Sequence, residues 1–286
     1  MKNFTVLTFL PVLCLVACAK VAEPAIFTEE PPPQAPTILT LKAEYPVEHC
    51  DIFLFEASGL RRLQKHFLCY CTDTTLYGLQ GDLLVAAIAN CPGKFNDKAA
   101  ERYDLLENFI FPYCEDRPDT PLMSATGLFA EGEALHLELT PLLCRIELSC
   151  IESYLDMYNM LAYLQNVNAS AEPLRQNGFV PSSMLNSYVF CDDDSDIMRV
   201  PSMLWTTLPP PRNWRYDYRP GISLYCYPNE GDDGPGSPAS EIVLEAESEG
   251  EALKFHCPLG KLPRGCCKMV EFKIKSPDDW SAEAYP

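Results

Sequence analysis

The sequence has few basic side chains, few histidines and only one long hydrophobic run. Its 286 residues hold 22 lysines and arginines, 40 aspartates and glutamates, and four histidines, for a formal net charge of −18. Such a surface repels nucleic acid and anionic membranes unless a local basic patch intervenes. After the first nineteen residues, no apolar run approaches the roughly 20 residues of a membrane-spanning helix, so we expect no membrane span.

The motifs of common enzyme classes are also missing. No Gly-x-Ser-x-Gly nucleophile elbow occurs. The four histidines, the usual general bases, are scattered at positions 49, 66, 136 and 256. We therefore predict no catalytic residue, no cofactor and no metal, and favour a protein that is not an enzyme. An extracellular hydrolase or hydrolase inhibitor, with a site assembled from distant residues, stays open as the alternative.

The opening segment has the form of a secretory signal peptide. Lys2 precedes an apolar run from Phe4 to Val16, and the run ends in Ala17-Cys18-Ala19. Signal peptidase cuts after such a small-x-small ending, so residues 1–19 should be removed from a secreted, extracellular chain. The stretch Leu15 to Cys18 also resembles a bacterial lipobox, and the alternative is therefore a chain that is lipid-anchored through Cys18.

Twelve cysteines follow this segment, which is an even number. An oxidising compartment keeps neighbouring thiols paired, so we predict a disulfide framework. Spacing alone does not give the connectivity. Zinc is disfavoured because the cluster from His66 to Cys71 has no known finger spacing. The predicted disulfide residues are Cys50, Cys69, Cys71, Cys91, Cys114, Cys144, Cys150, Cys191, Cys226, Cys257, Cys266 and Cys267.

The first half of the mature chain shows the helical period. Residues 20–45 are rich in proline and are predicted to be a disordered linker. Beyond them, apolar residues recur every three or four positions, which predicts four helices within a cysteine-rich helical region, 46–168. The predicted helices cover residues 60–68, 79–91, 99–110 and 146–164.

The second half, 169–286, instead shows the alternation of strands. Ile242 to Glu247 and Leu253 to Cys257 alternate around a Glu249-Gly250 turn, and Val270 to Ile274 alternates as well. These segments predict a hairpin plus a third strand of a small antiparallel sheet. The predicted fold class is thus α+β, with a disulfide-bonded helical N-terminal half followed by a small antiparallel β C-terminal half.

Two polar motifs are candidate modification or ion sites. Asn168 begins an Asn-Ala-Ser sequon and is predicted to carry an N-linked glycan at an exposed position if the host is eukaryotic. Asp192, Asp194 and Asp196 offer oxygen ligands of the kind calcium uses, but the turn glycine and the bidentate glutamate of an EF-hand are missing. We favour a solvated acidic loop over a calcium site.

One segment is locally basic and aromatic. Tyr, Trp and Arg dominate the hot spots of binding surfaces, so this segment is the predicted partner-binding site. The alternative is a proline-stiffened crossover whose rings cap the core. The predicted partner-binding residues are Arg212, Trp214, Arg215, Tyr216, Tyr218 and Arg219.

Two cysteine patterns resemble those of secreted fungal proteins. Cys69-Tyr70-Cys71, followed by Cys91-Pro92-Gly93, is similar to part of the CFEM pattern, and the segment ending in Cys266-Cys267 resembles the cysteine-doublet endings of fungal effector candidates. The chain lacks the eight closely packed cysteines of CFEM proteins, so heme binding is not implied. The resemblance implies a class of secreted fungal proteins, many of which act on a host or at the cell wall. The signal peptide, the twelve cysteines, the negative surface and the lack of a catalytic constellation predict a secreted, disulfide-rich, non-enzymatic binding protein, an effector-like virulence or cell-surface interaction factor. Its partner would be an extracellular protein or a cell-wall or host-surface component.

Overall fold

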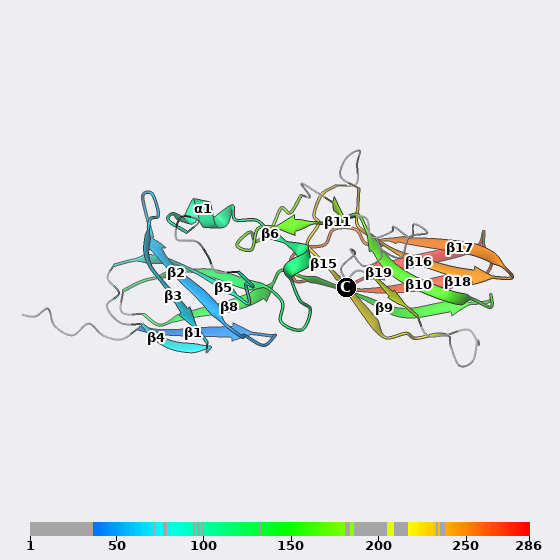
Figure 1. Cartoon of the computed structure of the whole chain (residues 1–286), viewed down its shortest axis with the longest axis horizontal. Coiled ribbons are helices and arrows are strands. Elements are labelled where there is room, and N and C mark those ends of the chain that lie inside the picture. The colour runs from blue at the N-terminus through cyan, green and yellow to red at the C-terminus, as the bar shows by residue number, and fades with distance from the viewer. Residues whose placement is uncertain are drawn as a thin grey trace, which may run out of the picture. The chain divides into compact units, whose positions relative to one another are not determined.

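The structure is a computed structural model, and strands make up most of the residues it describes (Figure 1). Described are residues 37–70, 72–76, 79, 81–93, 95, 98, 100–131, 133–180, 184–185, 205–208, 217–232, 234 and 238–286. The predicted signal peptide, 1–19, lies outside this part of the chain. None of the described helices is long and apolar enough to cross a membrane.

Seven strands form the first sheet, in the order β3-β2-β5-β7-β8-β1-β4. All neighbouring pairs are antiparallel except β1 with β8, which are parallel. The strands are β1 (Thr37–Ala43), β2 (Cys50–Glu56), β3 (Leu63–Cys69), β4 (Asp73–Leu76), β5 (Leu83–Ala89), β7 (Met123–Phe129) and β8 (Leu135–Pro141).

Two four-stranded sheets hold most of the remaining strands, in the orders β14-β10-β16-β17 and β15-β9-β18-β19. Both combine strands from before and after Asn168, the predicted domain boundary. The strands are β9 (Cys144–Ser153), β10 (Tyr158–Gln165), β14 (Trp205–Thr207), β15 (Ile222–Cys226), β16 (Glu241–Ser248), β17 (Glu251–Pro258), β18 (Cys267–Ile274) and β19 (Trp280–Tyr285).

The remaining elements are short. Two-residue strands pair as β11 (Val167–Asn168) with β13 (Met184–Leu185) and as β6 (Phe111–Pro112) with β12 (Ser170–Ala171). The helical elements of the described part are α1 (Tyr103–Glu107) and the 3-10 turn η1 (Tyr113–Glu115).

The predicted helical N-terminal half is wrong. Residues 60–68 contain most of β3, 79–91 contain β5, and 146–164 contain most of β9 and β10; only 99–110 holds a helix, the five-residue α1. The cause is clearest in β5, where Ala86 and Ile88 face one hydrophobic cluster and Val85 and Ala87 face another. A strand that is buried on both faces reads as a continuous apolar run, and such a run also satisfies the helical period.

The predicted hairpin between Ile242 and Cys257 is confirmed. Strands β16 and β17 pair in register from Glu241 with Pro258 to Ser248 with Glu251. The two turn residues, Glu249 and Gly250, have φ of 51° and 83°. Positive φ at both central residues is the signature of the tight turn that matches the twist of a hairpin.

The predicted third strand exists as β18, but its placement beside the hairpin is wrong. β18 lies in the other four-stranded sheet, where it pairs in parallel with β9 and antiparallel with β19. The second half is therefore not a separate small antiparallel sheet. Its strands complete sheets that begin with β9 and β10.

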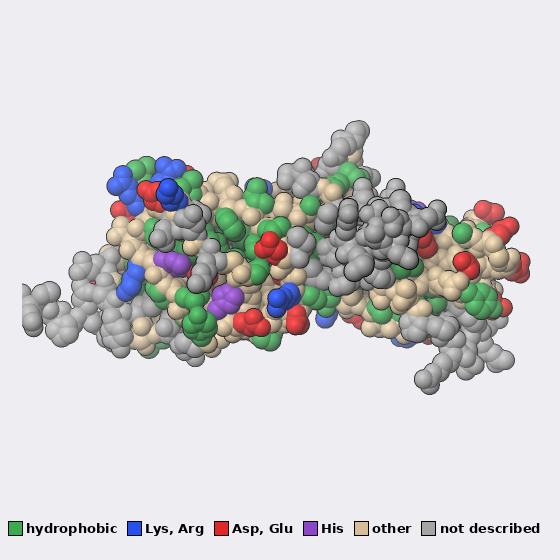
Figure 2. Space-filling model, viewed as in Figure 1, with side chains coloured by type: hydrophobic (Ala, Val, Ile, Leu, Met, Phe, Trp, Pro, Cys, Tyr) green, Lys and Arg blue, Asp and Glu red, His purple; other side chains and the backbone are tan. Residues whose placement is uncertain are grey.

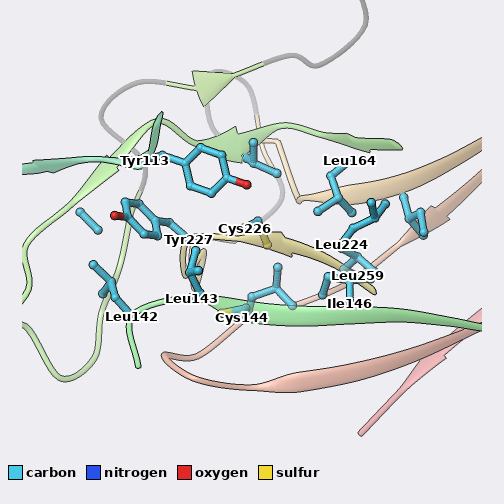
Figure 3. Packing of buried hydrophobic residues seen from close by; sticks show 14 of the residues in the cluster. Tyr113, Leu142, Leu143, Cys144, Ile146, Leu164, Leu224, Cys226, Tyr227 and Leu259 are labelled. Atoms are coloured by element: carbon cyan, nitrogen blue, oxygen red, sulfur yellow. The ribbon is translucent and has the colours of Figure 1, made fainter. Parts of the chain in front are cut away.

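Packing runs across the predicted boundary at Asn168. One buried cluster includes Ile88 of β5, Leu148 of β9 and Leu244 of β16. Figure 3 shows part of this cluster, with Tyr113 and Tyr227 packed near Cys144 and Cys226. β1 lies inside the stretch predicted to be a linker and buries Leu39 and Leu41. The domain boundaries themselves stay a prediction.

A buried carboxylate, Asp116, follows η1. Its Oδ1 accepts hydrogen bonds from the backbone N–H groups of Arg117 (2.8 Å) and Leu122 (2.9 Å). Burial nevertheless raises the pKa of Asp116 from 3.8 to about 6, because the three hydrogen bonds that favour the charged form, one of them from Tyr227, only partly offset the desolvation. The ionised side chain therefore weakens the fold near neutral pH.

This carboxylate predicts a stability that depends on pH. A folded-state pKa above the unfolded value adds stability that is fully present below about pH 4 and is lost as the pH rises through about 6. Asp116→Asn keeps an oxygen for the two N–H donors and carries no charge. We expect this variant to be more stable than the wild type by about 1–3 kcal/mol at pH 7.5, with the difference vanishing at pH 4, in urea titrations at both pH values. A difference independent of pH would contradict the assignment.

Candidate functional site

The predicted partner-binding segment is described at Tyr218 and Arg219 alone. The other four members, Arg212, Trp214, Arg215 and Tyr216, lie outside the described residues. Tyr218 forms an antiparallel bridge with Ile151, through N–H to carbonyl bonds of 2.8 and 3.0 Å, and its ring packs against the core. At Tyr218 the structure thus matches the alternative of a core-capping ring, whereas Arg219 is exposed.

Arg219 lies at the rim of a groove on the β15-β9-β18-β19 sheet, here called the Arg219 groove. The cavity measures about 370 Å³. Strands β9 and β18 supply its floor because their parallel register brings Cys150 beside Glu271. The lining residues are Cys150, Glu152, Asp217, Arg219, Glu271, Phe272 and Lys273.

Asp217 is the charged centre of the groove. Its Oδ1 accepts hydrogen bonds from Cys150 Sγ (3.1 Å) and Arg219 Nε (3.2 Å). These two donors, the thiol first and the guanidinium second, hold the pKa of Asp217 below its usual value. The carboxylate is therefore ionised at neutral pH and fixes the direction of Arg219.

Cys150 is not an activated nucleophile. Desolvation, followed by its hydrogen bond to Asp217, raises the pKa of the thiol to about 12. A thiolate is needed for attack, and a protonated thiol at neutral pH serves as a weak donor.

The groove alternates charges of both signs. Arg219 and Lys273 stand among three carboxylates, Glu152, Asp217 and Glu271. Tyr285 of β19 donates from its hydroxyl to Glu271 Oε1 at 2.7 Å and so orients that carboxylate. Phe272, between Glu271 and Lys273 on β18, is fully buried in the core, so charged and polar side chains form the open surface of the groove.

A second, larger groove lies beside the β2–β3 hairpin, and no sequence motif predicted it. Its cavity measures about 660 Å³. Gln64 Nε2 donates to Glu56 Oε1 at 3.1 Å across its wall, and Lys65 and Asp82 add charge. The wall residues come from three separate segments, around 54–59, 64–65 and 79–83, so no local motif marks the groove.

Charged side chains gather in patches on the surface. In Figure 2 basic side chains lie over α1 and the turn between β2 and β3. Arg61 and Arg62 lie in that turn, and Arg102 directly precedes α1. Acidic side chains gather over the far end of the β16–β17 hairpin in the same view. The overall negative charge is therefore unevenly spread.

Three of the four histidines contact carbonyl or carboxylate groups. His49 Nε2 lies 2.8 Å from the carbonyl oxygen of Cys91, and His256 Nδ1 lies 3.2 Å from Glu241 Oε2. His66 Nε2 lies 2.7 Å from Asp51 Oδ1 and its ring stacks on Phe53 at 4.3 Å. Within the described part of the chain, no three His, Cys, Asp or Glu side chains are arranged to hold a metal ion.

Nine of the twelve predicted disulfide cysteines have described side chains, and no disulfide joins any two of these nine in the structure. The side chains of Cys71, Cys114 and Cys191 lie outside the described residues. The thiols of Cys50 and Cys69 contact each other, and Cys144 contacts both Cys226 and Cys266. The structure thus brings together five of the predicted residues, and the disulfides stay a prediction.

The two remaining polar candidates differ in outcome. Asn168 was expected at an exposed position and this is wrong: it is 3% exposed, and its Nδ2 donates to the carbonyl of Pro228 at 3.4 Å. A glycan on Asn168 stays a prediction and would have to be added before the chain folds. The acidic loop with Asp192, Asp194 and Asp196 lies outside the described residues.

Comparison with known proteins gives matches in structure alone. No family model matches the chain, and no curated protein matches its sequence. A candidate cell adhesion protein from Bacteroides eggerthii superposes with a TM-score of 0.64 at 12% identity, covering 89% of this chain and 96% of that one. A candidate cell adhesion protein from Parabacteroides distasonis gives 0.62 at 9% identity, and the coverages are 88% and 96%.

A fimbrilin from Porphyromonas gingivalis also matches, with a TM-score of 0.61 at 7% identity and coverages of 88% and 96%. The chain shares the fold of these bacterial proteins. At such low identity, the likeness establishes the fold and not the activity.

The resemblance to fungal effector and CFEM proteins is therefore wrong. The similar structures are bacterial adhesion and fimbrial proteins. The pattern also required a helix between Cys71 and Cys91, where the structure has strands β4 and β5. Short cysteine spacings matched a family whose fold this chain does not have.

Proposed function

We propose that the protein is a cell-surface adhesion protein, attached to the cell by a lipid on Cys18 and binding its partner through the folded sheets. The observation that carries the proposal is the similarity in fold, which extends over nearly the full length of both this chain and a cell adhesion candidate. A binding role also fits the Arg219 groove, which holds a protonated thiol and the ion pair of Arg219 with Asp217.

Lipid attachment is favoured over simple secretion. The twelve cysteines after Cys18 are more typical of a secreted eukaryotic chain, which is an argument against a lipobox at Leu15 to Cys18. The similar folds come from bacteria, which removes the basis of that argument. An acylated cysteine needs a second contact for stable anchoring, and two or more acyl chains supply it.

The attachment is tested by Cys18→Ser in a Bacteroides host that is fed an alkyne fatty acid. We expect wild-type protein to carry the label and to stay with the cells. Cys18→Ser should lose the label and should fail to stay in the cell-surface fraction, whereas Cys14→Ser should behave as the wild type. Unlabelled wild-type protein, or label retained in Cys18→Ser, would contradict lipid attachment.

A fimbrial subunit is the second candidate function. It is favoured by the match to the fimbrilin and by a match to a tip fimbrial protein of Porphyromonas gingivalis, with a TM-score of 0.54 at 10% identity. Electron microscopy of cell-surface extracts distinguishes the two. Filaments that disappear when the gene is deleted support the subunit, and surface protein without filaments supports a free-standing adhesion protein.

A further inference from the structure

We propose that Cys50 and Cys69 form a cross-strand disulfide that fastens the edge strand of the seven-stranded sheet. Cys50 is the first residue of β2, and Cys69 is the last residue of β3. The two are direct partners in the antiparallel register. This pairing goes beyond the adhesive role and does not depend on it.

The geometry of the pair suits a disulfide. Directly opposed residues of an antiparallel pair have Cα atoms about 4.5–5.5 Å apart, inside the range of about 4.4–6.8 Å found for disulfides. Both side chains point to the same buried side of the sheet, with exposures of 0% and 7%. Their sulfurs are already hydrogen-bonding neighbours, so the bond needs no movement of the backbone.

The position explains what the bond would do. β3 is an edge strand, and within its sheet it is held by β2 alone. The hairpin turns near Gly59, so Cys50 and Cys69 lie at its open end, where an edge strand begins to fray. A link there closes a loop of roughly 20 residues and prevents β3 from peeling away from β2.

The chemistry requires an oxidant. Each thiol loses its hydrogen, an S–S bond forms, and two electrons and two protons pass to a disulfide of a small thiol or of an oxidoreductase, which becomes two thiols. The hydrogen bond with Cys69, followed by burial, raises the pKa of Cys50, so thiolate is scarce once the hairpin has closed. We therefore expect the bond to form during folding, after export.

Other cysteines do not offer one unambiguous partner. Cys144 contacts Cys226 across β9 and β15 and also contacts Cys266, so its sulfur has two competing neighbours. Cys71 is close to Cys69 in sequence and is the natural competitor for Cys50. The test must therefore separate Cys69 from Cys71.

Peptide mapping separates Cys69 from Cys71 and identifies the partner of Cys50. Protein collected from the cell surface is alkylated in denaturant without reductant and digested with trypsin and then chymotrypsin, which cleaves after Tyr70 and separates Cys69 from Cys71. We expect a disulfide-linked pair of peptides holding Cys50 and Cys69. Alkylated Cys50 and Cys69, or Cys50 linked to another cysteine, would overturn the proposal.

A stability measurement checks the same bond independently. We expect oxidised wild type to melt about 5–10 °C above Cys50→Ala/Cys69→Ala, and most of that gap to close when both are melted with reductant. Cys257→Ala is the matched control, because it removes a buried cysteine of β17 and leaves Cys50 and Cys69 in place. Reductant should lower its melting temperature by as much as it lowers that of the wild type. If the wild type and the double variant differ in melting temperature by the same amount with and without reductant, the difference reports lost packing, and the proposed disulfide is wrong.

Discussion

Replacing Arg264 with alanine should lower the free energy of unfolding by about 3–5 kcal/mol. Arg264 lies in the turn between β17 and β18, and its guanidinium donates to carbonyls of three other segments. Its Nη1 contacts the carbonyls of Pro173 (2.6 Å) and Arg175 (3.1 Å), and its Nη2 contacts the carbonyl of Thr140 and the hydroxyl of Ser124 (3.1 Å).

The size of this effect follows from burial. Desolvation lowers the pKa of Arg264 to about 10, which reports how completely the guanidinium is removed from water. Ser124 and Thr140 are register partners on β7 and β8, so one side chain holds two strands and the segment after β12. Truncation leaves several buried carbonyls without donors, each at a cost of about 1–3 kcal/mol before water enters.

Urea titration measures the loss of unfolding free energy in Arg264→Ala, and two further variants serve as controls. Arg264→Lys should recover only part of the stability, because an ammonium lacks the planar fork that reaches four acceptors. Arg102→Ala, which breaks an exposed ion pair with Asp104 of 2.6 Å, should change the midpoint little. Equal midpoints for Arg264→Ala and Arg102→Ala would show that the buried arginine contributes nothing.

Ala87→Asp should prevent folding or lower the free energy of unfolding by at least about 3 kcal/mol. Ala87 lies near the middle of β5, opposite Ile52 of β2 and Ala125 of β7, and it is fully buried. Its neighbour Ile88 is equally buried on the other face of the sheet. A carboxylate at this position has no partner and no path to water.

Ala252→Asp is the matched control. It makes the same change at an exposed position of β17, opposite Glu247. Surface substitutions of this kind change stability by about 0.5 kcal/mol, with a small addition from the like charge. Soluble, cooperative unfolding of Ala87→Asp at the wild-type urea midpoint would contradict the two-sided burial of β5.

How much of this fold the sequence predicts depends on how local each element is. The β16–β17 hairpin was predictable because alternation and the Glu249-Gly250 turn lie within eighteen residues. The parallel pairing of β9 with β18 joins segments more than one hundred residues apart, and no local pattern specifies it. The helical prediction failed at β5 because its apolar run is buried on two faces.

The candidate site follows the same division. Residue type alone pointed to Arg219, since it belongs to a locally basic, aromatic segment, and Tyr, Trp and Arg dominate the hot spots of binding surfaces. Cys150 and Glu271 could not be joined to it from the sequence, because the register of β9 with β18 and the bridge of Tyr218 with Ile151 bring them together. The sequence showed the lipobox at Cys18 as an alternative to secretion. The bacterial origin of the similar folds is the reason for proposing lipid attachment.

Attachment of living cells is the most direct test of the proposed adhesive role. A deletion strain, complemented with wild type, Cys18→Ser, Arg219→Glu or Lys275→Glu, is washed over an epithelial monolayer and the retained cells are counted. If the protein is a lipid-attached adhesion protein, deletion and Cys18→Ser should each reduce the number of retained cells at least tenfold. Arg219→Glu should reduce it similarly at an equal amount of surface protein. Lys275→Glu changes an exposed charge outside the Arg219 groove and should match the wild type. Retention of the deletion strain at the wild-type level would contradict an adhesive role.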